Sequence, residues 1–493
     1  MNQLFRRKPI ADLIPEGGEH GLKRVMGAGD LIMLAIGAVI GAGIFGAIGT
    51  AAAGQIGPNG EVIRQGAGPA LVLSFVLLGV ACALAGVCYA ELAAMIPQAG
   101  SAYAYSYATL GEFVAWIIGW DLILEYAVGN VAVAISWGDY FNTLLHGFGL
   151  TIPVWLTTGY RTALLSSDPA IHGLLQTAPH IGGIPILIHV PAFSIVMLIT
   201  VLLLQGAKES VRANNIMVVI KLLALGLFIA VGATHLHPEN FHPFAPNGFR
   251  GIHQGAAIVF FAYIGFDAIS TAAEECENPG RDMPRGILGS LAICTVLYLA
   301  AALVLTGMIP YAKLEGVADP LAAALTYVNQ GWAAGILAFG AVVAMTSVLL
   351  VFQLGQPRIL MAMSRDGLLG PWFGKIHPKY RTPYVTTILT GIFVAFFAAV
   401  ANIDEVVQLT NIGTLFAFVL VCIGILILRV REPDRPRKFR VPFSPVTPVL
   451  GIVMCLVLMG GLPAVTWIRF GIWLAVGLVV YFLYGARRSR LAC

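Results

Sequence analysis

The stretch Gly37-Ala38-Val39-Ile40-Gly41-Ala42-Gly43-Ile44-Phe45-Gly46 lies inside an apolar segment that extends from Asp30 to Ala53. Such a segment can cross the hydrocarbon core of a bilayer, which takes roughly 20 helical residues. Its four glycines oppose a continuous helix, because each glycine costs about 1 kcal/mol in a helix interior. The stretch therefore predicts either a surface of small residues for close helix packing or a membrane helix that unwinds near its middle.

The run from Gly41 to Gly46 also has the spacing GxGxxG, which occurs in dinucleotide-binding proteins. That motif requires a preceding strand within a βαβ unit. A transmembrane span provides neither, so we reject the dinucleotide interpretation. The sequence also has no CxxC pair and no HExxH motif or clustered metal ligands within a span, and neither a cofactor nor a metal is expected.

The rest of the chain repeats the character of this segment. Of its 493 residues, 58% are hydrophobic and 11% are charged, whereas roughly a quarter are charged in soluble domains. The composition predicts an all-α polytopic membrane protein and excludes a water-soluble enzyme. Twelve transmembrane helices are expected, at Asp30–Ala53, Pro69–Ile96, Phe113–Asn142, Ile184–Leu204, Asn214–Ala233, Gly255–Ala273, Ile287–Ile309, Trp332–Leu354, Val385–Ala401, Val406–Leu428, Thr447–Gly461 and Thr466–Gly485.

The distribution of Lys and Arg between alternating loops predicts the orientation in the membrane. With the N-terminus in the cytoplasm, 23 of the 29 basic residues lie on the cytoplasmic side and five on the opposite side, while Lys221 lies within a span. Both termini are therefore expected to be cytoplasmic. The basic segment Arg435–Arg440 belongs to one cytoplasmic loop, so no nucleic-acid binding is expected.

A second interruption is predicted in the sixth span, where Asp267 follows Gly265. An acidic residue within a span is costly and usually functional, and we expect Asp267 to be the N-cap of a restarted half-helix. Helices 1 and 6 run in opposite directions and both break near the middle of the membrane, which is the pattern of an inverted five-helix repeat. The expected divisions are a cytoplasmic N-terminal segment (1–27), a first repeat (28–233), a second repeat (250–428), helices 11 and 12 (447–485) and a cytoplasmic tail (486–493).

The ends of these half-helices predict the chemistry of a site between them. The outer half of helix 1 begins near Gly43, where free N–H groups and the positive end of the helix dipole suit a carboxylate. The outer half of helix 6 ends near Phe261 and Ala262, where free carbonyl groups suit an ammonium group. Both features together fit a zwitterionic α-amino acid, and no charged side chain is needed.

With these features, the sequence resembles the amino acid–polyamine–organocation (APC) superfamily, and within it the bacterial cationic amino acid transporter group. The motifs that carry the resemblance run through most of the chain, at Gly41–Phe45, Tyr89–Glu91, Pro97, Gly100–Tyr103, Trp120–Tyr126, Phe260–Asp267, Glu275–Pro284 and Ser364–Gly367. The resemblance implies a transporter without enzymatic activity. It also implies a LeuT-like fold, with a 5+5 inverted repeat, discontinuous helices 1 and 6, and two C-terminal helices.

The resemblance also implies which residues bind the substrate. The carboxylate is expected on the amides of Gly41, Ala42 and Gly43, and the ammonium group on the carbonyls of Phe261, Ala262 and Ile264. Phe352 in helix 8 aligns with a pocket position that is small and polar in carriers of arginine and lysine. Its phenyl ring favours small or medium neutral amino acids, and the alternative is ordinary packing of Phe352 in the core or against lipid.

Two charged residues within the spans are candidates for proton coupling. Lys221 either extends its side chain to the membrane surface or, as the resemblance implies, replaces a coupling sodium ion and exchanges a proton. Glu125 lies one turn after Asp121 in helix 3, and a buried carboxylate needs a partner. A pair between Glu125 and Lys221 is therefore our hypothesis for the coupling site.

The sequence thus predicts a secondary active transporter of L-amino acids that works by alternating access with a proton as the coupling ion. Twelve spans match the bacterial members of the family, which places the protein in the bacterial inner membrane. An exchanger on the same fold and a carrier of cationic amino acids remain alternatives. A channel is disfavoured because no rings of charge occur in the spans, and a transporter-like receptor is a more distant alternative.

Overall fold

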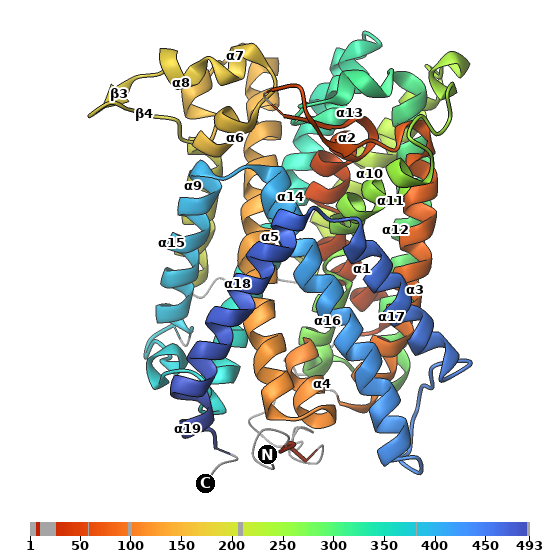
Figure 1. Cartoon of the computed structure of the whole chain (residues 1–493), viewed down its shortest axis with the longest axis vertical. Helices are drawn as coiled ribbons and strands as arrows, with labels where there is room; N and C mark the ends of the chain where they lie inside the picture. Colours follow the sequence, from red (N-terminus) through yellow and green to blue (C-terminus); the bar gives the residue numbers. More distant parts are fainter. Residues whose placement is uncertain are drawn as a thin grey trace.

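The computed structural model describes residues 6–9, 26–57, 59–96, 101–205, 211–380 and 382–490. Pro97 and Gly100 of the family motifs, and most of the predicted segment 1–27, lie outside these residues. The described chain is a bundle of helices with two short antiparallel β-hairpins (Figure 1). The strands are β1 (Gly54–Ile56), β2 (Val62–Gln65), β3 (His180–Ile181) and β4 (Ile184–Pro185).

Most described residues belong to α-helices, with a few short 3₁₀ and π-helical turns. The α-helices are α1 (Ala28–Val39), α2 (Ile48–Ala53), α3 (Leu71–Met95), α4 (Ser101–Thr109), α5 (Glu112–Gly147), α6 (Tyr160–Leu165), α7 (Pro169–His172), α8 (Leu174–Thr177), α9 (Val190–Leu204), α10 (Val211–Ala233), α11 (Gly248–Val259), α12 (Pro279–Met308), α13 (Pro320–Tyr327), α14 (Gly331–Arg365), α15 (Tyr384–Val400), α16 (Ile403–Arg431), α17 (Val446–Gly460), α18 (Ala464–Val480) and α19 (Ala486–Arg488). The turns used below are η2 (Gly43–Ala47), η6 (Phe260–Tyr263) and η7 (Phe266–Glu275).

Eight helices of the described chain are long and apolar enough to cross a membrane. The pair Ala28–Val39 and Gly43–Ala53 is a ninth if its two halves form one span. The axis of this pair bends by 44° at the break. Three shorter apolar helices, α9, α15 and α17, coincide with the predicted fourth, ninth and eleventh spans. The structure thus shows a polytopic helical protein, whereas the twelve-span inverted repeat and the five predicted divisions of the chain stay predictions.

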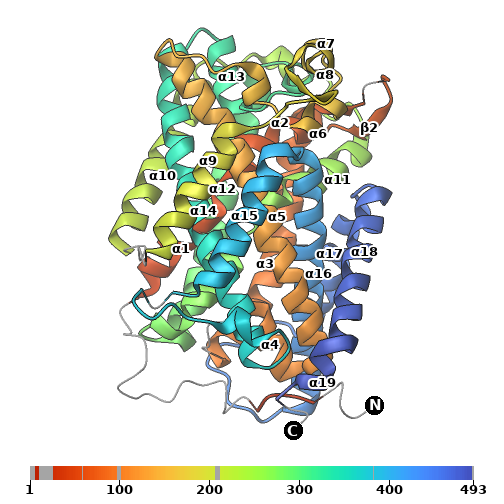
Figure 2. The same ribbon diagram turned by 90° about the vertical axis from the view of Figure 1, so that its left-hand side faces the viewer.

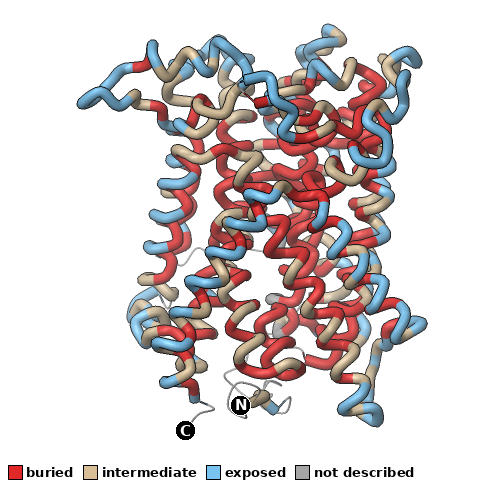
Figure 3. The backbone as a smooth tube through the Cα atoms, in the orientation of Figure 1, coloured by how far each residue is buried: buried red, intermediate tan, exposed pale blue. Residues whose placement is uncertain are grey.

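The centre of the bundle is α5, which packs against α14, α16, α9, α15 and α4. Helices α9 and α15 lie side by side, at one edge of the bundle in Figure 1 and toward the viewer in Figure 2. Buried residues fill the middle of the bundle, and exposed residues lie mainly on its outer faces and at its two ends (Figure 3). An apolar outer surface is what a bilayer requires, because lipid tails solvate those side chains.

The two ends of the bundle carry different segments. The α13 end also carries α6, α7, α8 and the β3–β4 hairpin (Figure 1). At the α4 end, Lys8 Nζ lies 3.2 Å from Asp366 Oδ1 and the amide of Arg490 donates to the Asp366 carbonyl at 3.1 Å. The first and last described residues therefore meet at one end of the molecule, and the cytoplasmic location of that end stays a prediction.

The predicted start of the fourth span is wrong by several residues. The fourth span was expected to begin at Ile184, but Ile184 and Pro185 form strand β4, and α9 begins at Val190. Gly182 and Gly183 have positive φ angles and turn the chain into the hairpin. The backbone conformation of these glycines outweighs the apolar character of the following residues.

Candidate functional site

Helix 1 is interrupted within the glycine-rich stretch. Helix α1 ends at Val39, Ile40 is extended (φ −77°, ψ 99°), and the π-helical turn η2 begins at Gly43. The amides of Ile44 and Phe45 donate to the carbonyl of Gly41 at 3.2 and 3.1 Å. The amides of Gly41, Ala42 and Gly43 precede these bonds, at a helix start where N–H groups have no intrahelical acceptor.

Helix 6 is interrupted at Gly265. Helix α11 gives way to the 3₁₀ turn η6, and Gly265 then adopts the left-handed region with φ 115°. Gly265 itself is the N-cap of η7, so the prediction that Asp267 would cap the restarted helix is wrong. The reason is conformational, since only glycine takes this φ angle without strain. Asp267 instead accepts a hydrogen bond from Ser101 Oγ at 3.3 Å.

The two interruptions touch each other directly. A Cβ atom placed on Gly43 would lie 2.7 Å from the Ala262 Cβ and nearer still to the Ala262 backbone. Similarly, a Cβ atom on Gly265 would lie 2.9 Å from the carbonyl of Ala38. Each broken helix thus offers a glycine against the backbone of the other, and the main chains approach more closely than residues with side chains allow.

Polar side chains on neighbouring helices bind carbonyl groups at and beside the interruptions. Tyr140 Oη donates to the Phe45 carbonyl at 2.8 Å, and Asn411 Nδ2 donates to the Ala257 and Ile258 carbonyls at 2.8 and 3.0 Å. These carbonyls lie in the helical segments that border the breaks, and the contacts supply them with hydrogen-bond donors inside an apolar bundle.

Tyr298 in α12 makes the contact closest to the predicted ammonium site. Its hydroxyl lies 2.8 Å from the Ala262 carbonyl and 3.3 Å from the Val39 carbonyl, so it reaches both broken helices. The predicted site residues did not include Tyr298, Tyr140 or Asn411. Their presence could have been noticed in the sequence, because a Tyr or Asn within an apolar span indicates a polar partner inside the bundle.

Gly43 and Ala262, two of the six predicted backbone positions, touch each other, and the other four lie within two residues of them along the chain. On the carbonyl side, Phe261 accepts a long bond of 3.4 Å from the Ile264 amide, and Ala262 accepts the Tyr298 hydroxyl. A carbonyl oxygen has two lone pairs, so both can accept a second donor. The arrangement brings the main chains of helix 1 and helix 6 into direct contact, without a charged side chain among the six.

Lys221 lies beside the helix 1 break and is fully buried. Its Nζ atom lies 2.7 Å from the Gly37 carbonyl, 3.1 Å from the Ile40 carbonyl, 3.3 Å from the Ala344 carbonyl and 2.8 Å from Ser347 Oγ. The interpretation that Lys221 extends to the membrane surface is therefore wrong. Four converging oxygens form the environment that an ammonium group or a small cation requires.

Glu125 occupies a different place in the bundle. It is buried in α5, interacts with Thr414 of α16, and has Asp267 and Asp121 as electrostatic neighbours. The structure gives no ion pair between Glu125 and Lys221 among the described residues. Similar depth along two helices, on which the predicted pair rested, does not fix which way each helix faces.

Asp121 completes a group of three buried carboxyls with Glu125 and Asp267. Both carboxylate oxygens of Asp121 are buried without a hydrogen-bond partner in the described part of the chain. The group therefore places three carboxyl side chains inside the apolar bundle.

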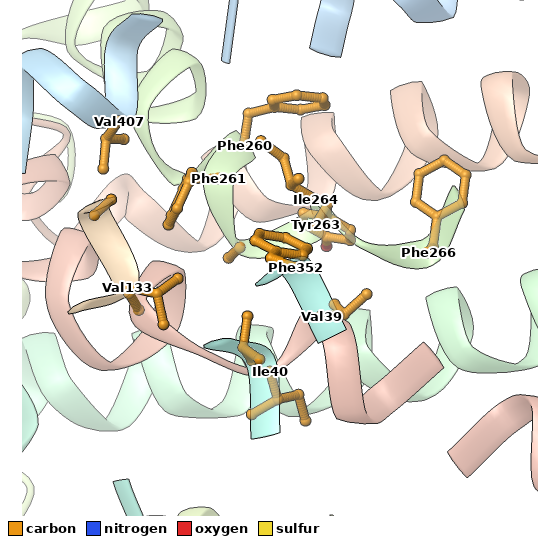
Figure 4. Close-up of a cluster of buried hydrophobic side chains, with 14 of the residues drawn as sticks. Val39, Ile40, Val133, Phe260, Phe261, Tyr263, Ile264, Phe266, Phe352 and Val407 are labelled. Atoms are coloured by element: carbon orange, nitrogen blue, oxygen red, sulfur yellow. The ribbon is translucent and has the colours of Figure 1, made fainter. Parts of the chain in front are cut away.

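Phe352 points into the interior and not toward lipid. Its side chain is buried, and its ring centroid lies 5.3 Å from that of Tyr126 in α5. Figure 4 shows Phe352 in an apolar cluster with Phe260, Phe261 and Ile264 from the helix 6 break. This burial excludes the lipid-facing alternative, and a pocket role for Phe352 stays a prediction.

Interrupted membrane helices with a backbone-lined contact between them are the architecture of a membrane transporter. Among the described residues, no group of His, Cys, Asp and Glu could hold a metal ion. Comparison with known proteins agrees with this class: residues 28–484 match the family model described as "Amino acid permease". The chain belongs to the amino acid permease family of the APC superfamily, and it is a transporter and not an enzyme.

Full-length relatives carry two different substrate names. A branched-chain amino acid permease of Bacillus subtilis is 47% identical over 99% of both chains. A methylthioribose transporter of the same organism is 46% identical over the full length of both chains. A vacuolar cationic amino acid transporter of Arabidopsis thaliana is 37% identical over 88% of this chain and 68% of its own length.

Proposed function

We propose that this protein is a proton-coupled symporter of small or medium neutral L-amino acids. The observation that carries the proposal is the contact of the two helix breaks at Gly43 and Ala262. This contact brings amide donors and carbonyl acceptors together, which a zwitterion needs at its two ends. The carboxylate would bind the amides of Gly41, Ala42 and Gly43, and the ammonium group the carbonyls of Phe261, Ala262 and Ile264.

The environment of Lys221 supports the proton as coupling ion. Burial favours the neutral amine, whereas four oxygen partners favour the charged ammonium, so small movements of helix 1 change the balance. Glu125, within its group of carboxyls, would be a second site on the path of the proton. The charged amine would hold α1 against α14, and the neutral amine would release it.

Phe352 supports a neutral substrate. A buried phenyl ring beside the helix 6 break leaves little room for a long cationic side chain and offers no polar partner to it. The branched-chain substrate in the name of one relative is consistent with this apolar surrounding.

The direct test is uptake by purified protein in proteoliposomes. We expect leucine, isoleucine, valine or alanine to accumulate when an inward proton gradient is imposed, and replacement of sodium by potassium to have no effect. Uptake that needs an amino acid inside the vesicles, and ignores the gradient, would support the exchanger instead. Tight binding of arginine would support the cationic carrier.

A second candidate substrate is methylthioribose, because one relative of that name matches the chain over its full length. Methylthioribose has neither a carboxylate nor an ammonium group, so it cannot use both ends of the proposed site. Uptake of labelled leucine and of labelled methylthioribose, each measured alone, distinguishes the two, and uptake of methylthioribose without uptake of leucine, isoleucine, valine or alanine would overturn the amino acid assignment.

A further inference from the structure

A pocket of about 740 Å³ opens at the α4 end of the bundle, away from the two helix breaks. Its lining combines three basic residues with three apolar ones. Arg281, Pro284, Arg285 and Leu288 belong to α12, whereas Lys438 and Phe439 lie in the segment between α16 and α17.

The position of Lys438 depends on a glycine. A Cβ atom on Gly280 would lie 2.9 Å from the Lys438 Cβ and nearer still to its Cδ, so the lysine stem crosses the first turn of α12 where no side chain blocks it. This packing keeps Lys438 in the same pocket as Arg281 and Arg285. The positive end of a 30-residue helix adds to the field of the three cations.

The pocket keeps an excess of positive charge. Arg281 Nε donates to Asp282 Oδ1 at 2.8 Å, and Glu277 also acts on the charge of Arg281, so two acids stand against three cations. The Arg281 side chain is nevertheless 63% exposed, so the rest of its guanidinium is open to a ligand. Arg285 and Lys438 are exposed as well. An anionic group such as a phosphate suits this balance.

The pocket continues into the outer, apolar face of α12. Arg285, Leu288, Ala292 and Val296 follow one another at spacings of three and four residues, which places them on one side of the helix. Val296 is 67% exposed, and α12 is one of the helices long and apolar enough to cross the membrane. The basic rim thus lies at the head of a surface that acyl chains cover.

We propose that this pocket binds the phosphate of an anionic phospholipid, with the acyl chains along α12. The basic residues provide the charge for the phosphate, and basic pockets at the membrane surface of helices are suited to such head groups. The apolar residues decide between a lipid and a soluble phosphate, because Leu288, Phe439 and the exposed face of α12 contribute only if the ligand carries hydrocarbon. The proposal does not depend on the transported substrate.

The test is lipid binding by the full chain in detergent, measured by native mass spectrometry and by thermal unfolding. Dioleoyl phosphatidylglycerol and dioleoyl phosphatidylcholine are titrated in parallel. We expect phosphatidylglycerol to bind at least about tenfold more tightly, and the double variant Arg285→Gln/Lys438→Gln to lose that preference. Both residues are exposed, so this variant should fold.

The matched control is Lys375→Gln/Arg487→Gln, which removes two exposed cations of the chain outside the pocket. It should retain the preference for phosphatidylglycerol. Equal loss in both double variants would show a general charge effect and overturn the site. Glycerol 3-phosphate and inorganic phosphate form the second arm: if either protects against unfolding as well as the lipid does, the pocket binds soluble phosphate and the lipid assignment is wrong.

Discussion

Gly43 of helix 1 and Ala262 of helix 6 lie backbone against backbone, so close that a Cβ atom on Gly43 would overlap the Ala262 main chain. This contact explains why the break in helix 1 contains glycine at that position. It also joins the two halves of the proposed substrate site, because displacement of one broken segment displaces the other.

The Gly43–Ala262 contact predicts the effect of a single added methyl group. Gly43→Ala should lower substrate affinity at least about tenfold, since separation of the two segments misplaces both binding surfaces. Gly335→Ala is the control, because its new Cβ meets no atom within 4 Å. Binding is measured by scintillation proximity on purified protein, and unchanged affinity in Gly43→Ala would move the site elsewhere.

Lys221 should be necessary for coupling substrate uptake to the proton gradient, and less necessary for the exchange of substrate across the membrane. Lys221→Ala should abolish proton-driven accumulation, and Lys221→Arg should not restore it, because arginine does not release its proton. Counterflow of labelled substrate should continue in at least one of the variants. A folding defect would remove counterflow and uptake together, and normal gradient-driven uptake in Lys221→Ala would exclude the coupling role.

Phe352 should restrict the size and charge of the substrate. Phe352→Ser should admit arginine or lysine as competitors of leucine uptake, whereas Phe352→Leu should not, because leucine keeps the site filled and apolar. Removal of a buried phenyl ring costs about 3–5 kcal/mol of stability. The competition is therefore measured on protein that stays monodisperse in size-exclusion chromatography, and an unaltered substrate range in Phe352→Ser would make Phe352 a packing residue.

Asp319, at the start of α13, should give the protein a pH-dependent stability. Burial raises the pKa of Asp319 to about 6, while the hydroxyl of Thr143 in α5, 2.6 Å from Oδ2, opposes that rise. Asp139 and His146 of α5 are the charged groups that act on it. The folded chain binds more protons than the unfolded chain between pH 4 and 6, so this contribution is present below about pH 4 and lost as the pH rises through 6.

The check is the free energy of unfolding, measured by denaturation at several pH values between 4.5 and 7.5. The Asp319→Asn variant should show a flatter profile than the unaltered protein, by an amount on the order of 2 kcal/mol across this range. Thr143→Ser keeps the hydroxyl and should behave as the unaltered protein does. Identical profiles for the unaltered protein and Asp319→Asn would show that Asp319 does not titrate in this range.

Sequence patterns located the helices and both interruptions well, because each depends on local properties. Apolar length predicts a membrane helix, and glycine at 41, 43 and 265 predicts where a helix unwinds. The predicted N-cap of η7 was wrong, because Gly265 occupies the position that we had assigned to Asp267. The predicted start of α9 was wrong too, because the turn at Gly182 and Gly183 was not recognised beside apolar residues.

The amino-acid sequence by itself determined that this is a polytopic helical protein with breaks in helices 1 and 6 and a lysine within the fifth predicted span. Only the tertiary structure decided what these features face. Lys221 meets four oxygens of the helix 1 region and α14, and Tyr298 reaches the Ala262 carbonyl from α12. The physical reason is that spacing along a helix fixes depth and side, whereas the rotation and packing of many similar apolar helices depend on contacts between residues far apart in the chain.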